Sequence, residues 1–201
     1  MATKTKKTTK RAPIKSTKTR EQWLNALVKQ MAPWFKKLGK PLPKVRVSIG
    51  FTSAGRRGKA IGECWCETAS DDGVFEIFII PTIDDSKRVA DIVAHELVHA
   101  AVGLKAKHGA AFKSVATALG LTGKMTATVA GPEFLEKIKP ILAKLGPIPH
   151  AKLKPGKPKQ TTRLVKCMCG ECGYIVRTTE KWINDVGAPL CPCNKEEMEV
   201  C

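Results

Sequence analysis

Two histidines four residues apart, with a glutamate beside the first, stand in the otherwise nearly apolar stretch DIVAHELVHAAVG, residues 91–103. On an α-helix His95 and His99 lie one turn apart on the same face, so both imidazoles can reach one metal ion. Glu96 lies where its carboxylate can act as a general base on a water at that metal. This HExxH spacing is typical of zinc-dependent hydrolases. The alternative, two histidines in a core helix, leaves polar groups in apolar surroundings without partners.

A catalytic zinc site needs a third protein ligand and an open fourth position. The sequence has no Asp or Glu between Glu96 and Glu133, so a carboxylate ligand on the next helix is not available. The longer pattern HExxHxxGxxH requires a histidine where Lys105 stands. We therefore predict His108 as the third ligand, because LKAKHG can turn the chain back toward the metal; the alternative is an ordinary polar loop residue. His150 is expected to take no part.

Two further residues near this helix have open roles. Asp91, four residues before His95, could orient the second nitrogen of that ring. We favour the alternative, a carboxylate that faces solvent or interacts with the helix dipole. Met125, in GKMTATVAG, could lie under the metal, but a plain core methionine is the favoured interpretation.

A second metal-binding pattern lies near the C-terminus, where the last forty residues hold six of the eight cysteines. Cys169-x2-Cys172-Gly is followed, after eighteen residues, by Cys191-Pro-Cys193. Four thiolates close a tetrahedral structural zinc site, and in so short a module zinc supplies much of the folding energy. A CxC second pair is less usual than CxxC, so the fourth ligand stays open. The possible substitutes are Cys167 and Cys201.

The formal charge of +17 is concentrated in two segments. Residues 1–20 hold eight Lys/Arg and no acid, and residues 147–166 hold six and no acid, so these forty residues carry +14. Lysine-rich segments bind polyanions through counterion release, and we predict a nucleic acid partner, DNA first, over a tail that only aids solubility. The predicted contacts are Lys152, Lys154, Lys157, Lys159 and Arg163. Arg177, Lys181 and Trp182 could add charge and a stacking face, unless Trp182 belongs to the core of the cysteine module.

The elements that must position these residues follow from hydrophobic periodicity. A helix is expected from residue 21, kinked or split by Pro33 and ended by Gly39. The histidine helix is expected to begin at a cap within residues 82–86 and to end at Gly103, with two more helices after it. The segments KVRVSIGF, AIGECWCE and GVFEIFIIP predict a small antiparallel sheet, the last two joined by the hairpin signal SDDG. On the middle strand two small buried residues are expected, Cys64 and Cys66.

Composition predicts the organisation of the chain. We expect a disordered basic tail (1–20), a metal-binding domain (21–146), a Pro/Lys linker (147–162) and a cysteine module (163–201). The sequence has no apolar run long enough for a membrane span, and its basic N-terminal residues lack the apolar segment of a secretory leader, so we expect neither. The default expectation is therefore the cytoplasm, or the host cytoplasm for a viral protein, with reduced cysteines and a monomeric chain.

HELVHA, KHGAAFK and a four-cysteine ribbon, in this order over residues 21–201, resemble the SprT-like family. WLNALV, AIGECW and RTTEKW look like its bacterial and phage branch. The resemblance implies an α+β, minimal zincin-like domain followed by a zinc ribbon, with His95, His99 and His108 on a catalytic zinc and Glu96 as the base. Spartan, the best-known relative, cleaves proteins crosslinked to DNA and is activated by DNA. The implied function is an endopeptidase acting on DNA-associated protein substrates, with two zinc ions per chain.

A non-enzymatic function is the alternative. The chain could be a transcription-related regulator that binds nucleic acid, in which the histidine site is structural. Glu96 favours the enzyme, because a structural zinc site has no use for a base.

Overall fold

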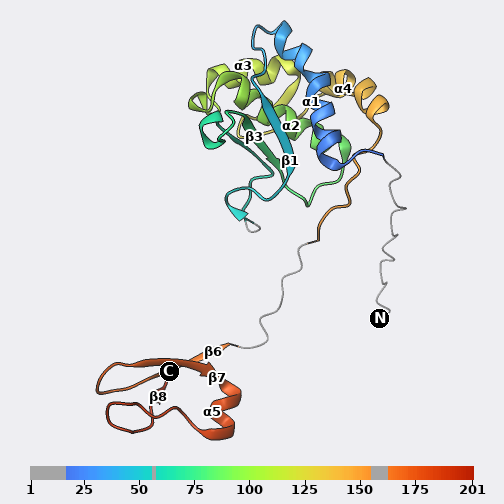
Figure 1. Cartoon of the computed structure of the whole chain (residues 1–201). Helices are drawn as coiled ribbons and strands as arrows, with labels where there is room; N and C mark the ends of the chain where they lie inside the picture. The colour runs from blue at the N-terminus through green and yellow to red at the C-terminus, as the bar shows by residue number, and fades with distance from the viewer. Residues whose placement is uncertain (1–16, 56–57, 155–162) are drawn as a thin grey trace, which may run out of the picture. The chain divides into compact units, whose positions relative to one another are not determined.

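The computed structural model describes residues 17–55, 58–154 and 163–201. The chain divides into two compact units, Met1–Pro155 and Gly156–Cys201, both visible in Figure 1. Helices and small sheets occur together, which confirms the α+β prediction. No helix in these ranges is long and apolar enough to cross a membrane. The predictions for residues 1–16 and for Lys157 and Lys159 fall outside the described residues.

The first helix, α1, spans Arg20–Lys37 and begins with a capping box. The Thr19 side chain accepts from the backbone N–H of Gln22, and the Gln22 side chain accepts from the N–H of Thr19, which satisfies two otherwise unpaired donors. Pro33 lies inside the helix, which continues to Lys37, so of the two predicted effects of Pro33 the split is wrong. One face of α1 is buried in the core, through Trp23, Leu24, Leu27, Val28, Met31 and Phe35.

The sheet of the first unit is mixed and has the order β1-β3-β2. Its strands are β1 (Val45–Ile49), β2 (Gly62–Trp65) and β3 (Phe75–Ile79). The predicted hairpin is present, since β2 and β3 are antiparallel, but β1 runs parallel to β3. The antiparallel prediction for β1 is therefore wrong. Buried positions alternate along β3, so one face of this central strand packs on the core.

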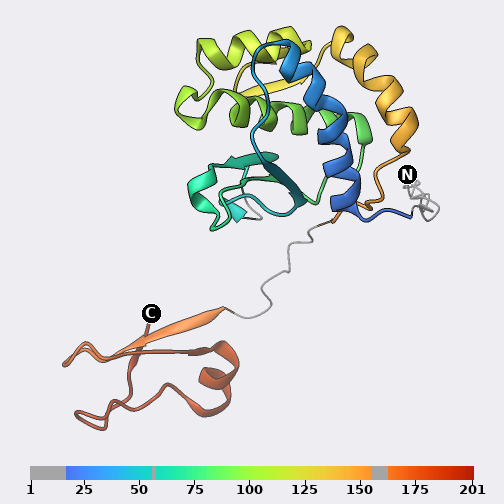
Figure 2. The ribbon, with the colours of Figure 1, turned by 45° about the horizontal axis from the view of Figure 1, so that its top comes forward.

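Helix α2 (Ser86–Val102) is the central element of the first unit. The Asp85 side chain accepts from the backbone N–H of Arg88 and caps the start, and Gly103 ends the helix as predicted. The helix packs against β2 and β3 on one side and against α3 (Ala110–Leu119) on another. Figure 2 shows α2, in green, between the sheet and α3. Most of its residues are buried, so its polar side chains lie within a core.

A β-hairpin that the sequence patterns did not indicate follows α3. It consists of β4 (Leu121–Lys124) and β5 (Ala127–Ala130), and it is followed by α4 (Pro132–Leu145). Strand β5 packs against α2. Met125, in the turn, is partly buried against the core, as the plain core interpretation predicted.

The first part of the expected linker packs on the first unit. Ile148 is fully buried, and the backbone N–H of Leu153 donates to the carbonyl of Pro81. His150 is also buried, with Nε2 2.9 Å from the Pro81 carbonyl oxygen and Nδ1 3.5 Å from Arg20 Nη1. Residues 147–154 therefore belong to the folded body, and His150 has a structural place away from the other histidines.

The second unit is a small sheet of order β7-β6-β8 with one short helix. Its elements are β6 (Leu164–Met168), β7 (Ile175–Thr179), α5 (Glu180–Val186) and β8 (Glu199–Val200). Over residues 163–201 its buried cluster consists of Cys167, Cys169, Cys191 and Met198, with Val176 and Ile183 packed against it. A core this small provides little hydrophobic stabilisation.

Candidate metal centres

The three predicted histidine ligands converge on one point in the first unit. His95 and His99 come from consecutive turns of α2, and His108 comes from the turn between α2 and α3. The Nε2 atom of His108 lies 3.2 Å from that of His95 and 3.1 Å from that of His99. The three ligand atoms form one of two groups, among the described residues, that could hold a metal ion.

These distances fit a tetrahedral metal site. Ligands at about 2.0–2.1 Å from a zinc ion would hold their nitrogens roughly 3.3 Å apart. Desolvation and the neighbouring imidazoles lower the pKa of His95 and His99 to about 4, so both rings are neutral at pH 7. Desolvation also lowers the pKa of His108. When all three neutral rings carry their proton on Nδ1, the Nε2 lone pairs point at one another and repel, and a bound cation turns that repulsion into attraction.

The turn that delivers His108 has an unusual backbone. After Gly103 and the short helix η3 (Leu104–Ala106), Lys107 adopts φ 46°, ψ −131°. A non-glycine residue at positive φ is strained, which costs about 1–3 kcal/mol. The reversal at this residue returns the chain to α2 and places His108 opposite His95 and His99.

Glu96 is buried beside this cluster and packs against strand β2. It is 6% exposed. A Cβ atom added to Gly62 of β2 would lie 2.6 Å from Glu96 Oε1, closer than any side chain allows. Burial, with a further contribution from Glu63, raises the pKa of Glu96 to about 8. A cation on the histidines would favour the ionised form and lower that pKa.

A cleft of about 540 Å³ contains all four residues. Strand β2 lines one wall through Gly62, Glu63 and Cys64, and residues 126–128 line another. The face of α2 that carries the histidines lines the same cleft. The cleft therefore combines a candidate metal site, a carboxylate and room for a ligand.

Two residues that support the histidines were not found from the sequence. Phe112 of α3 is fully buried, and its ring centroid lies 4.8, 4.5 and 4.9 Å from those of His95, His99 and His108. Thr128 of β5 places Oγ1 2.7 Å from His95 Nδ1. Phe112 could have been found in KHGAAFK, because it follows His108 by about one helical turn. No sequence pattern indicates a role for the hydroxyl of Thr128.

The favoured interpretation of Asp91 is wrong. Its carboxylate is buried, accepts from Arg88 Nη1 at 2.8 Å at both oxygens, and also accepts from the backbone N–H of Ala130. The other possibility, direct orientation of His95, is not observed either, because Thr128 occupies the Nδ1 side of that ring.

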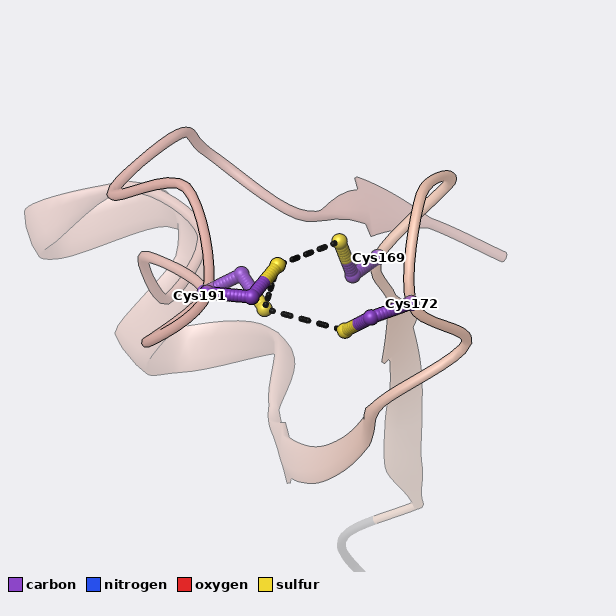
Figure 3. A group of neighbouring side chains, drawn as sticks. Cys169, Cys172 and Cys191 are labelled. Carbon is purple, nitrogen blue, oxygen red and sulfur yellow. Dashed lines mark hydrogen bonds between the residues drawn. The ribbon is translucent and has the colours of Figure 1, made fainter.

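The second candidate centre is formed by the four predicted cysteines, Cys169, Cys172, Cys191 and Cys193. Sulfur–sulfur distances are 3.7 Å for 169–193, 3.5 Å for 172–191 and 3.3 Å for 191–193. Figure 3 shows Cys169 and Cys172 on one loop, facing Cys191 on another. A zinc ion at about 2.3 Å from each sulfur would hold them roughly 3.8 Å apart, so the cluster is close to the geometry of a closed site.

The thiols of this cluster differ in acidity. Backbone N–H groups of Cys172 and Glu171 lower the pKa of Cys169 to about 7, while the neighbouring Cys191 raises the pKa of Cys193. Without a cation, four thiolates cannot form so close together. A bound divalent ion removes that conflict, because it stabilises every thiolate at once.

The remaining cysteines lie outside this group. Cys167 is buried in the core of the second unit, and Cys201 is exposed with its Sγ near the carbonyl of Glu199. Cys64 and Cys66 are half-buried and not fully buried as predicted. Cys64 lines the cleft, and burial raises the pKa of its thiol to about 12.

The described residues of the predicted nucleic acid interface are on the surface. Lys152, Lys154 and Arg163 are exposed. Trp182 is 52% exposed, with Lys181 Nζ 4.9 Å from its ring centroid, so it is not the core of the second unit. Arg177 is exposed on β7.

Comparison of the chain with models of protein families, with curated proteins and with solved structures gives no match. The functional assignment therefore depends on the geometry of the two centres.

Proposed function

We propose that the first unit is a zinc-dependent peptidase of the SprT-like kind, with a minimal zincin-like fold, and that the second unit is a structural zinc ribbon. The observation that carries the proposal is the convergence of the three Nε2 atoms beside a buried glutamate in an open cleft. A purely structural site gains nothing from a carboxylate that is costly to bury. The exposed cleft also offers the open position that a catalytic site needs.

In this proposal each residue of the cleft has a separate task. A zinc ion on the three histidines would supply Lewis acidity toward a water and a peptide carbonyl. Glu96 takes a proton from the attacking water and delivers it to the leaving amine. Burial raises the pKa of Glu96 and a cation on the histidines would lower it, and the lowering leaves the carboxylate ionised for the first step. Gly62 leaves the space that the carboxylate occupies.

We further propose that DNA-associated proteins are the substrates and that DNA is a partner. Arg20 Nη1 lies 3.5 Å from His150 Nδ1, so one described residue of each basic segment lies at the same place on the first unit. Lys152 and Lys154 are exposed there. Residues 163–201 contain five Lys/Arg and six Asp/Glu, so the ribbon contributes little net charge. Phosphate contacts are therefore assigned mainly to the basic residues that precede the ribbon in the sequence.

A cleavage assay tests the enzyme directly. Zinc-loaded protein is incubated with a basic DNA-binding protein, with and without single-stranded DNA, and self-cleavage is scored in the same lanes. We expect fragments that increase with DNA and a loss of about 10²-fold or more in Glu96→Gln, since a general base contributes about 10²–10⁴-fold. Bound zinc and DNA affinity should remain unchanged in that variant.

Glu136→Gln is the matched control, because Glu136 is exposed on α4 and receives the same chemical change. It should cleave as the unmodified chain does. Full activity in Glu96→Gln would remove Glu96 from the mechanism. An absence of fragments under every condition, with two zinc ions bound, would replace the peptidase with the nucleic-acid-binding regulator.

A further inference from the structure

The second nitrogen of His95 has a specific partner. Its Nδ1 atom lies 2.7 Å from Thr128 Oγ1, and Thr128 is 5% exposed. An imidazole that binds a metal through Nε2 must carry its proton on Nδ1, so the Thr128 oxygen then accepts this hydrogen bond. A ring held in the opposite tautomer, with the proton on Nε2, cannot be a ligand.

Strand β5, which carries Thr128, is hydrogen-bonded to helix α2, which carries His95. The backbone N–H of Ala130 donates to Asp91 Oδ2 at 3.0 Å. Arg88 Nη1 donates to both oxygens of Asp91 and lies 3.5 Å from the carbonyl oxygen of Thr128. Asp91 and Arg88 stand one and two turns before His95 on α2. Side chains of α2 thus make hydrogen bonds to the β5 backbone at Thr128 and at Ala130.

The three rings are not supported alike. Within the described part of the chain, Nδ1 of His99 is buried without a hydrogen-bond partner, and this ring is held by packing on Phe112. His95 has packing and a hydrogen bond together. The hydroxyl of Thr128 is therefore the side-chain group best placed to select a tautomer within the cluster.

We propose that Thr128 is a positioning residue of the histidine centre, which fixes the tautomer and the ring orientation of His95, and that the Arg88–Asp91 pair on α2 sets its location. The inference rests on the proposed metal site. The acceptor is a neutral hydroxyl, whereas many zinc-binding histidines donate to a carboxylate. A neutral acceptor adds no negative charge to the ligand and leaves the bound cation a stronger Lewis acid.

Metal titration of the full chain tests this without any cleavage assay. Cobalt(II) is the probe, because imidazole and thiolate ligands give it different absorption bands, so the histidine centre is read separately from the cysteine centre. Thr128→Val keeps the shape and removes the acceptor; we expect about 10–100-fold weaker binding at the histidine centre. Thr128→Ser restores the acceptor and should bind within about threefold of the unmodified chain.

Thr122→Val is the matched control on the partner strand β4, where the side chain is exposed and its hydroxyl donates a long, 3.5 Å hydrogen bond to the carbonyl of Val129. Its cobalt affinity should be unchanged. Circular dichroism and the unfolding midpoint of each metal-free variant verify that the first unit is folded. Equal affinity in folded Thr128→Val and in the unmodified chain overturns the positioning role. No cobalt at the histidines of the unmodified chain overturns the metal site itself, and with it the proposed function.

Discussion

Glu96 is a carboxylate in a place where ionisation is costly. Its side chain is buried between α2 and β2, and burial raises its pKa from an ordinary value of 4.5 to about 8. The folded chain therefore binds this proton more tightly than the unfolded chain does. Between these two pH values the protonated carboxyl is favoured by folding, and its stabilisation is lost as the pH rises.

A prediction on pH dependence follows for the metal-free protein. Glu96→Gln removes the ionisation, so its stability relative to the unmodified chain should grow as the pH rises from 4.5 to 8, by roughly 3–5 kcal/mol in total. Urea unfolding of both proteins at several pH values measures the difference. Glu136→Gln should run parallel to the unmodified chain. A constant gap between Glu96→Gln and the unmodified chain would show that Glu96 ionises as freely in the folded state as in the unfolded one.

At the residue scale, the ligand types were predictable and their supports were not. Histidines and cysteines are uncommon in this chain, so the spacing of the four cysteines and of His95, His99 and His108 identified both groups. Thr128 and Asp91 are ordinary residue types, and their roles depend on which hydrogen bonds β5 makes to α2. No periodicity in the sequence encodes that contact between elements.

At the scale of elements, the close approach of β2 to α2 determines the position of the Glu96 carboxylate. A Cβ atom at Gly62 would stand 2.6 Å from Glu96 Oε1 and 2.7 Å from Ile92 Cγ2. Glycine is thus required by the spacing between strand and helix. Any side chain there forces either Glu96 or the strand to move.

We predict that Gly62→Ala lowers the free energy of unfolding by about 1–3 kcal/mol through overpacking. It should also reduce any peptidase activity, because the base is displaced, while zinc content stays the same. The companion variant Glu96→Ala removes the crowding carboxylate, so the double variant should lose less stability than the sum of the two single changes. Strict additivity in chemical denaturation would show that the two residues do not compete for space.

The elements themselves were predicted unevenly. Helices α1 and α2 carry long apolar stripes and clear caps, which made them recognisable. The order of the sheet was not recognisable, because β1 pairs with β3 and not with β2, the next strand along the chain. The β4–β5 hairpin is short and mostly exposed, with four residues in each strand, so its alternation was too brief to detect.

At the scale of the whole molecule, the two units depend on metal to different degrees. The first has an extended apolar core built from helices and a sheet. Among the described residues of the second, four are buried in its core, and two of these, Cys169 and Cys191, belong to the candidate metal site. The first unit should therefore stay folded without metal, whereas the second should not.

Hydrogen exchange measured before and after chelation tests this difference. We expect amides in residues 163–201 to lose protection when metal is removed, while those of α1 and α2 keep theirs. Cys191→Ser should reproduce the loss without a chelator. Cys201→Ser, outside the cluster, should not. Persistent protection of residues 163–201 in the absence of metal would mean that the small core of the second unit keeps it folded without metal.

The burial of Ile148 and His150 has a practical consequence for dividing the chain. A truncated protein that stops at Gly146 would leave the pocket of Ile148 open to water and would remove the hydrogen bonds that His150 and Leu153 make to Pro81. Such a fragment would lose solubility for reasons unrelated to the missing zinc ribbon. A fragment ending at Lys154 keeps these contacts, and it is the natural unit for expression, crystallisation and separate assay of the histidine centre.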